Sequence, residues 1–221
     1  MNRHALPAAA ALVAAAALLL TACSGSDDSE STSKSIDRTA GTAAAEAKPS
    51  SPGTAASNHS AERPKVALPP DLKMNFEPVD TSDPREKTVL SDGAERMRAI
   101  NGAVDSTDPI YAALNFYNIG KARPEAARWV RKFKNAGLSI TGSITYFNRH
   151  AEIDTTKSAT LTFCADESKA YSKETKTGRI ITTAPSKKDF ILYRTGLSMN
   201  DNGVWQTSRI VSTAGATSCV R

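Results

Sequence analysis

The segment Ser158-Ala159-Thr160-Leu161-Thr162-Phe163-Cys164-Ala165-Asp166 is the clearest indication of the fold class, because its side chains alternate in character along the chain. Leu161 and Phe163 fall on one face and the two threonines on the other, which is the period of a strand with one buried face. The same period predicts four more strands, with an Asp201-Asn202-Gly203 hairpin turn before the last. These strands are expected at residues 138–153, 179–184, 188–197 and 203–212. Gly142 lies inside the longest of them and predicts a bulge or bend there.

The residues before this region follow a helical period instead. Apolar side chains recur three and four residues apart in segments 89–104, 109–117 and 124–136. Asp108 stands directly before a proline, which is typical of a helix start, and Gly137 is typical of a helix end. Helices followed by an antiparallel meander predict an α+β fold, with the N-terminal helices packed on one face of a curved antiparallel sheet.

Three helices followed by a bent sheet resemble the cone-shaped fold of the nuclear transport factor 2-like superfamily. The stretch from Thr160 to Ser168, the later Asp201-Asn202-Gly203-Val204-Trp205 and a cysteine near the C-terminus are similar to actinobacterial lipoproteins with such a domain. The resemblance covers about residues 89–221, and the domain is assigned to residues 85–221. It implies the cone fold, and relatives include isomerases and cyclases whose catalytic pattern has no residue-by-residue match in this chain.

The N-terminus has the features of an export signal. Arg3 supplies one fixed positive charge, and residues 5–20 are uncharged and mostly Ala, Leu and Val. The following Leu20-Thr21-Ala22-Cys23 resembles the lipobox of bacterial lipoproteins. That resemblance implies removal of residues 1–22, diacylglyceryl attachment to the Cys23 sulfur, and a protein anchored by lipid at the extracytoplasmic face of the cell membrane. The alternative is an ordinary secretory signal with an accidental cysteine.

Residues 23–84 are expected to form the lipidated cysteine and a disordered tether. Ser, Thr, Ala, Gly and Pro dominate this segment, and Phe76 is its only aromatic residue. Such a composition buries too little apolar surface to offset the entropy of ordering. Prolines near its end favour an extended chain, so residues 65–79 are a candidate strap along the domain.

The charge of the chain limits its partners. The full sequence carries a net charge of +5, and acidic residues outnumber basic ones in the tether while the reverse holds in the domain. A basic domain outside the cell meets anionic lipid, phosphate-rich wall polymer or an acidic envelope protein. We expect the membrane as a partner through the lipid, with an envelope protein or an anionic wall polymer as a possible second one. Nucleic acid is not expected, since no motif for it is present.

Lipidation of Cys23 leaves two cysteines, Cys164 and Cys219. Two cysteines in an exported domain most often pair, so a disulfide is predicted between them. A reactive thiol or a metal pair is the alternative. Neither has a CxxC motif or a nearby histidine in its favour.

Residues with catalytic potential are sparse. His150 is the only histidine in the predicted domain, and an exposed strand residue is its simpler interpretation. No nucleophile elbow or phosphate-binding loop is present. Asp154 and Asp166 qualify only by their chemistry, and Asp166 is also typical of a turn. We therefore predict no catalytic residue, no metal site and no cofactor.

Two groups of side chains are candidates for binding. Aromatic residues on the predicted strands are either core or the lining of a pocket in the cone: Tyr146, Tyr193 and Trp205. Basic residues on the third predicted helix form either a partner-binding face or a solvated face: Arg128, Arg131, Lys132 and Lys134.

The sequence favours a non-enzymatic binding or assembly module in the cell envelope, since the chain has a long tether, a basic domain and no catalytic constellation. The alternative is a small-molecule-binding protein, or an isomerase- or cyclase-like enzyme, that uses the cone pocket. A subunit of a secretion or transfer complex is a third possibility.

Overall fold

The computed structural model describes residues 62–221. The expected signal peptide, Cys23 and the first part of the tether lie outside these residues. No helix of the described part is long and apolar enough to cross a membrane.

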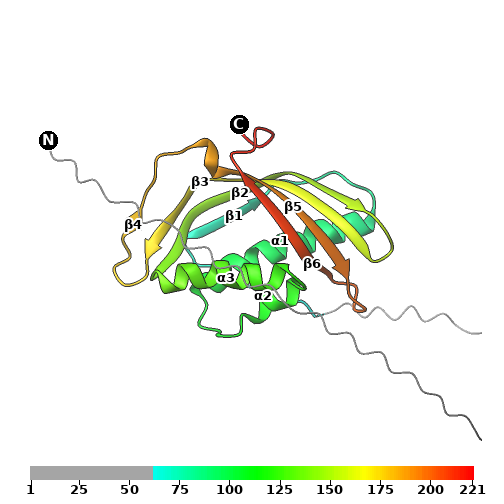
Figure 1. Ribbon diagram of the computed structural model, residues 1–221, viewed down its shortest axis with the longest axis horizontal. Coiled ribbons are helices and arrows are strands. Elements are labelled where there is room, and N and C mark those ends of the chain that lie inside the picture. Colours follow the sequence, from blue (N-terminus) through cyan, green and yellow to red (C-terminus); the bar gives the residue numbers. More distant parts are fainter. Residues whose placement is uncertain (1–61) are drawn as a thin grey trace, which may run out of the picture. The chain divides into compact units, whose positions relative to one another are not determined.

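The predicted architecture is confirmed: helices pack on one face of a curved sheet (Figure 1). The helices are α1 (Pro84–Asp105), α2 (Ala112–Tyr117) and α3 (Ala122–Asn135). The strands are β1 (Leu72–Phe76), β2 (Leu138–Ile153), β3 (Ser158–Glu174), β4 (Ile180–Ile181), β5 (Phe190–Met199) and β6 (Trp205–Ala214). The sheet order is β1-β2-β3-β5-β6, with β4 beside β3, and every pairing is antiparallel except that of β1 with β2. This is the α+β architecture expected from the sequence, with the helices on one face of a curved sheet.

Local chemistry explains the ends of these elements. Asp83 caps α1 by accepting a hydrogen bond from Arg85 N at 2.7 Å, and a proline follows at the first helical position. Gly137 ends α3 with a φ of 66°, a conformation that glycine adopts without a steric cost. The predicted bend in β2 occurs as two register shifts, between Ser143 and Thr145 and between Phe147 and His150.

Two predicted elements are shorter in the structure. The strand expected at residues 179–184 forms only at Ile180–Ile181, which pair with Lys173 and Ser172 of β3. The helix expected from Pro109 begins at Ala112. The Asp108 carboxylate instead accepts hydrogen bonds from Ile110 N at 2.9 Å and Ala112 N at 2.7 Å, which holds the preceding turn.

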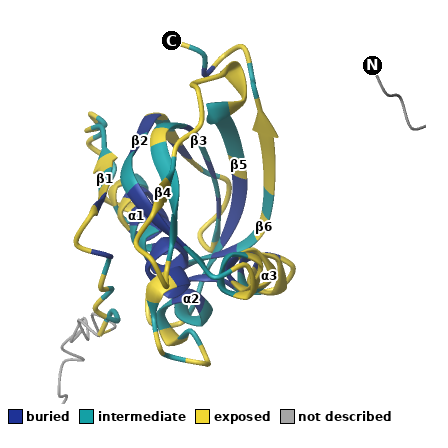
Figure 2. Ribbon diagram, turned by 90° about the vertical axis from the view of Figure 1, so that its left-hand side faces the viewer, coloured by how far each residue is buried: buried dark blue, intermediate teal, exposed yellow. Residues whose placement is uncertain are grey.

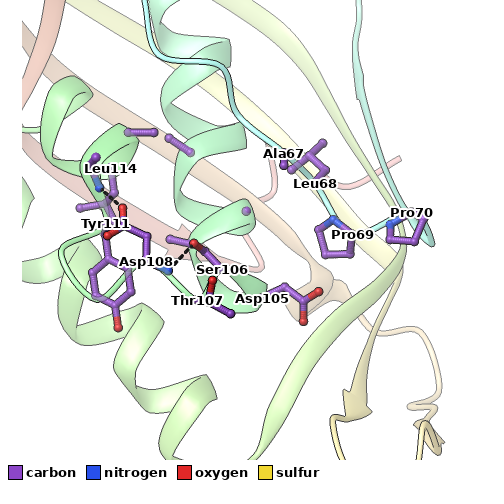
Figure 3. A pocket seen from close by; sticks show the side chains of 15 residues that line it. Ala67, Leu68, Pro69, Pro70, Asp105, Ser106, Thr107, Asp108, Tyr111 and Leu114 are labelled. Atoms are coloured by element: carbon purple, nitrogen blue, oxygen red, sulfur yellow. Dashed lines mark hydrogen bonds between the residues drawn. The ribbon is translucent and has the colours of Figure 1, made fainter.

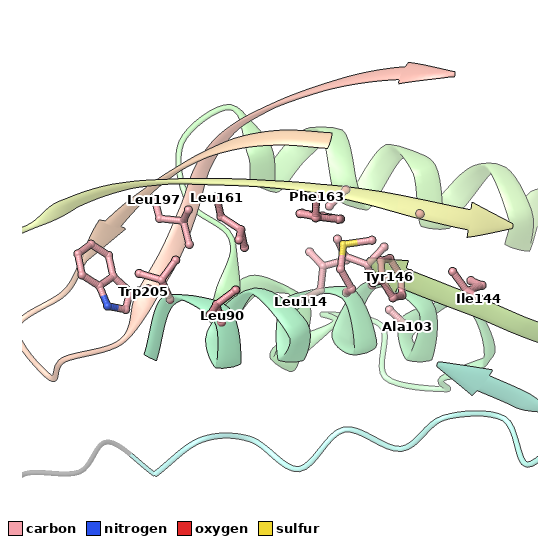
Figure 4. Packing of buried hydrophobic residues seen from close by; sticks show 14 of the residues in the cluster. Leu90, Ala103, Leu114, Ile144, Tyr146, Leu161, Phe163, Leu197 and Trp205 are labelled. Atoms are coloured by element: carbon pink, nitrogen blue, oxygen red, sulfur yellow. The ribbon is translucent and has the colours of Figure 1, made fainter. Parts of the chain in front are cut away.

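The hydrophobic core lies between α1 and the concave face of the sheet (Figures 2 and 4). Leu161 and Phe163 of segment 158–166 are 2% and 4% exposed, as their period predicts. Trp205 is at one end of the core and is 2% exposed. A side chain longer than hydrogen at Gly93 would collide with Leu161, so this glycine lets α1 approach the sheet closely.

The predicted disulfide between Cys164 and Cys219 is present, with Cα atoms 5.5 Å apart. It lies on the face of β3 opposite to Leu161 and Phe163, in a small apolar cluster with Phe147. The bond holds the C-terminal segment against the outer side of the sheet.

Residues 62–83 form a strap on the domain, which includes the candidate strap at residues 65–79 and precedes the boundary expected at residue 85. Arg63 donates two hydrogen bonds to the buried Asp92 carboxylate of α1, at 2.7 and 3.1 Å. Ala67 passes so close to Gly102 that a Cβ there would meet the Ala67 carbonyl oxygen at 2.4 Å. The strap then enters the sheet as β1, whose five residues pair in parallel with β2. Backbone pairing gives this polar, proline-rich segment the stability that its composition lacks.

Candidate functional site

A pocket of about 460 Å³ opens between α1, α3 and the concave face of the sheet, and we call it the cone pocket. Its apolar lining comes mainly from both helices and the last two strands: Met97, Ile100, Ala126, Trp129, Ile191, Ile210 and Ala214. Its polar lining is spread over the same elements and β2 and β3: Arg96, Asn101, Glu125, Tyr146, Glu167, Tyr193 and Ser212.

Arg96 is a buried cation in the wall of the cone pocket, with 3% of its surface exposed. Its Nε donates a hydrogen bond to Asn118 Oδ1 at 2.6 Å, and its Nη1 approaches the Met97 sulfur at 3.5 Å. Burial lowers the pKa of Arg96 to about 10, so the guanidinium keeps its charge at neutral pH. None of the ion pairs within residues 62–221 includes it.

Tyr146 projects into the same space from the bent strand β2. Its ring stacks on Phe76 of the strap, with centroids 4.6 Å apart. The residue is 1% exposed, and its hydroxyl has no hydrogen-bond partner among the described residues. The Asn101 amide donates to Met97 O at 2.9 Å, and its closeness to the Tyr146 hydroxyl lowers the pKa of that phenol without offsetting the effect of burial. Burial raises the pKa of Tyr146 well above its usual value, so the phenol stays protonated and available as a donor.

Glu167 and Tyr193 form a second polar group in the cone pocket, on β3 and β5. Burial, followed by repulsion from Asp189, raises the pKa of Glu167 to about 7, and hydrogen bonding by Tyr193 opposes the rise. Burial, and after it the charge of Glu167, raise the pKa of Tyr193. Near neutral pH the Glu167 carboxyl therefore exists in both its protonated and its ionised form.

The structure places Tyr146 and Tyr193 on the pocket wall but not Trp205. The indole of Trp205 belongs to the core, and its backbone N donates to Asp92 Oδ2 at 2.9 Å. Arg96 and Glu167 were not predicted from sequence. In the sequence, Arg96 is marked only as a charge beside the apolar stripe of a helix, and Glu167 only as a carboxylate near a predicted strand.

The basic face of α3 is only partly as predicted. Arg128, Arg131 and Lys132 are exposed. Lys134 is partly buried, because its Nζ donates to Ser106 O at 2.5 Å and lies 5.8 Å from the centre of the Tyr111 ring. This lysine holds the loop after α1 and is removed from the candidate binding face.

The other candidates from sequence do not gather into a site. His150 is exposed on β2, Asp154 accepts a hydrogen bond from Thr160 Oγ1 at 3.2 Å, and Asp166 accepts from Ser168. Within residues 62–221, no three His, Cys, Asp or Glu side chains cluster in a way that would hold a metal ion.

A second hollow, of about 390 Å³, lies between residues 67–70 of the strap, the end of α1 and the start of α2 (Figure 3). Ser106 and Asp108, two of the polar residues along it, already have partners within the loop. Ser106 Oγ accepts from Asp108 N at 3.0 Å, and the Asp108 carboxylate accepts two backbone hydrogen bonds. The cone pocket is the better candidate site because it contains a buried hydroxyl without a partner among residues 62–221 and a buried cation that forms no ion pair within them.

No protein-family model and no curated protein matches the chain. A ketosteroid isomerase-like protein from Erwinia carotovora atroseptica is structurally similar at 12% identity and a TM-score of 0.42, over 60% of this chain and 97% of that one. The intermembrane space region of the chloroplast protein ARC6 is similar at 12% identity and a TM-score of 0.36, over 58% and 96%. A Catenulispora acidiphila protein is similar at 11% identity and a TM-score of 0.37, over 58% and 89%. Similarity at this level carries no inference about activity.

Proposed function

We propose that the protein is an exported lipoprotein, held by lipid on Cys23 at the extracytoplasmic face of the cell membrane, whose domain is a non-enzymatic module that binds a small, mostly apolar molecule in the cone pocket. The lipobox-like Leu20-Thr21-Ala22-Cys23 and the uncharged stretch before it support the anchor. Two acyl chains on one cysteine give stable membrane attachment. A Cys23→Ala variant should therefore be released from membranes or fail to mature. A full-length Cys23→Ala protein that still fractionates with membranes would exclude the anchor.

The observation that carries the binding role is the cone pocket itself. Its volume of about 460 Å³ and its mixture of many apolar and a few polar lining residues are typical of small-molecule sites. Because of this pocket, we favour binding of a small ligand over the assembly or partner-binding role that the sequence favoured. The wall is built from α1, α3 and four strands, so the site has a rigid frame.

The binding role is tested with N-phenyl-1-naphthylamine, a neutral apolar dye whose fluorescence rises in apolar surroundings. Ser212 and Thr213 are adjacent exposed residues of β6, and only Ser212 lines the pocket. We expect wild-type protein and Thr213→Phe to bind the dye, and Ser212→Phe to bind it at least about tenfold more weakly because the phenyl ring obstructs the pocket. Absence of dye binding by the wild-type protein, or equal binding by both variants, would refute a pocket-based function.

A second candidate is a proton-transfer enzyme of the isomerase or cyclase type. The observation in its favour is the pair formed by Glu167 and Tyr193, since a carboxyl with a pKa near 7 is suited to general acid–base work. The test uses 2-tetralone, an apolar ketone, and follows exchange of its α-protons with D₂O by NMR. Acceleration by wild-type protein but not by Glu167→Gln would favour the enzyme, and no acceleration would count against it.

The exposed basic residues of α3 support a further proposal about partners. Arg128, Arg131 and Lys132 are positioned to meet an anionic wall polymer or an acidic envelope protein. Retention on wall teichoic acid should fall as salt rises and should be lost in the triple Gln variant. Retention that is independent of salt, or unchanged in the variant, would contradict this partner.

A further inference from the structure

Arg96 has a buried positive charge without a matching negative charge. Taking a guanidinium out of water is costly unless an anion and hydrogen-bond acceptors replace the water. The Asn118 amide oxygen is neutral, and the Met97 sulfur is a weak acceptor. Glu125 also lines the pocket and raises the pKa of Arg96, but this effect is smaller than the lowering by burial. The described part of the chain therefore leaves the charge of Arg96 largely uncompensated.

Asp92, on the same helix, shows that buried charges in this domain do not generally lack an oppositely charged partner. Asp92 is fully buried, and its carboxylate accepts from Arg63 and from the backbone N of Trp205. The chain thus provides partners for a buried charge where the charge serves the fold. Arg96 faces the cone pocket instead, and so does Tyr146, whose buried hydroxyl lacks a partner among residues 62–221.

We propose that the cone pocket binds an apolar molecule that carries one carboxylate, with Arg96 and the Tyr146 hydroxyl holding the carboxylate and the apolar lining holding the rest of the ligand. This proposal rests on the proposed binding function and adds the chemical class of the ligand. A guanidinium and a phenol both donate to an oxyanion, and hydrogen bonds to a charged group are among the stronger ones.

The head group is assigned as a monoanion because of the other charges in the pocket. Glu125 and Glu167 line the same cavity, so a doubly charged phosphate would meet two carboxyl groups and a single guanidinium. A carboxylate needs one positive charge, which Arg96 supplies. Most of the remaining lining, including Ile100, Trp129 and Ile191, is apolar and suits an apolar body.

The experiment compares decanoate with 1-decanol, which share an apolar chain and differ in charge, as competitors of N-phenyl-1-naphthylamine. We expect decanoate to displace the dye from wild-type protein at concentrations about ten- to hundredfold lower than 1-decanol. Arg96→Gln should remove most of this preference, because it weakens displacement by decanoate far more than displacement by 1-decanol. Arg131→Gln, an exposed arginine on α3, is the control for general attraction of anions and should keep the preference.

Tyr146→Phe provides a second variant in case Arg96→Gln does not fold. Its matched control is Tyr117→Phe, since the Tyr117 hydroxyl is also buried without a partner but does not line the cone pocket. Only Tyr146→Phe should weaken decanoate binding, by about threefold to tenfold. Equal displacement by decanoate and 1-decanol in the wild type, or a preference that survives both pocket variants, would overturn the carboxylate assignment alone. Failure of the dye to bind at all would overturn the pocket function with it.

Discussion

The ion pair between Arg63 and Asp92 offers the strongest test of how the strap is held. Asp92 is completely buried, whereas 31% of the Arg63 side chain is exposed. The carboxylate accepts hydrogen bonds from Arg63 Nε at 2.7 Å, Arg63 Nη2 at 3.1 Å and Trp205 N at 2.9 Å. It therefore joins the strap, helix α1 and strand β6 at one point. We consider Arg63→Met, Asp92→Ala and the double variant.

The two single changes should not cost the same. Arg63→Met leaves a fully buried carboxylate with one donor, and breaking a buried pair in this way costs about 3–5 kcal/mol. In Asp92→Ala the half-exposed Arg63 turns to water and loses little. The main decrease in the free energy of unfolding there comes from the Trp205 N–H, which no longer has an acceptor, and from the deleted side chain. Together these cost about 2–4 kcal/mol. Once Asp92 is absent, Arg63 has no partner, so the double variant should resemble Asp92→Ala.

The assay is equilibrium unfolding in urea, followed by far-ultraviolet circular dichroism and tryptophan fluorescence. The expected coupling between the two positions is about 3 kcal/mol, because the cost of Arg63→Met disappears when Asp92 is already removed. Lys157→Met is the control, since its partner Asp201 is almost fully exposed and the unfolding midpoint should not move. Costs that simply add in the double variant, or an Arg63→Met protein with the wild-type midpoint, would refute this account of the strap.

Three further predictions follow from single features. Replacing Cys164 and Cys219 by Ser opens a loop with a sequence separation of 55 and should cost about 4 kcal/mol in urea unfolding; an unchanged midpoint would contradict this. Gly102→Val should push the Ala67 carbonyl away and accelerate proteolysis of the strap at a cost of about 1–3 kcal/mol, and equal proteolysis rates would count against the contact. Because the pKa of Glu167 rises from 4.5 to about 7 on folding, its contribution to stability is complete below pH 4.5 and is lost as the pH rises toward 7. Glu167→Gln should flatten that slope, and a slope unchanged in the variant would exclude Glu167 as its source.

The sequence predicted those elements whose pattern is local. The alternation of residues 138–153 gave the bounds of β2, and the helical period of residues 89–104 located the middle of α1. The true start of α1 lies at Pro84, where the apolar stripe has not begun and only the Asp83 cap marks the helix. Hydrophobic periodicity and turn-forming residues act within a few residues of the chain, so they can be recognised in the sequence without knowledge of the fold.

β1 and the cone pocket depend instead on distant partners. Leu72 pairs with Gly142, and nothing in the composition of the strap indicates a strand. The polar groups of the pocket come from α1, α3, β2, β3, β5 and β6. In the sequence Arg96 looks like a solvated helix residue and Glu167 like the end of a strand, and only the fold brings them to one cavity.

A buried hydroxyl without a partner is weak evidence for a ligand by itself, because Tyr117 has one outside the cone pocket. Tyr146 and Arg96 line a single cavity, and this coincidence indicates a ligand. Both lose free energy through desolvation, and apolar residues of similar size would be at least as stable at these positions. The Tyr146 ring belongs to the core beside Phe163, but its hydroxyl adds nothing to the apolar contacts there, and Arg96 is not a member of that core. Groups that weaken a fold and converge on a cavity are the expected trace of selection for binding.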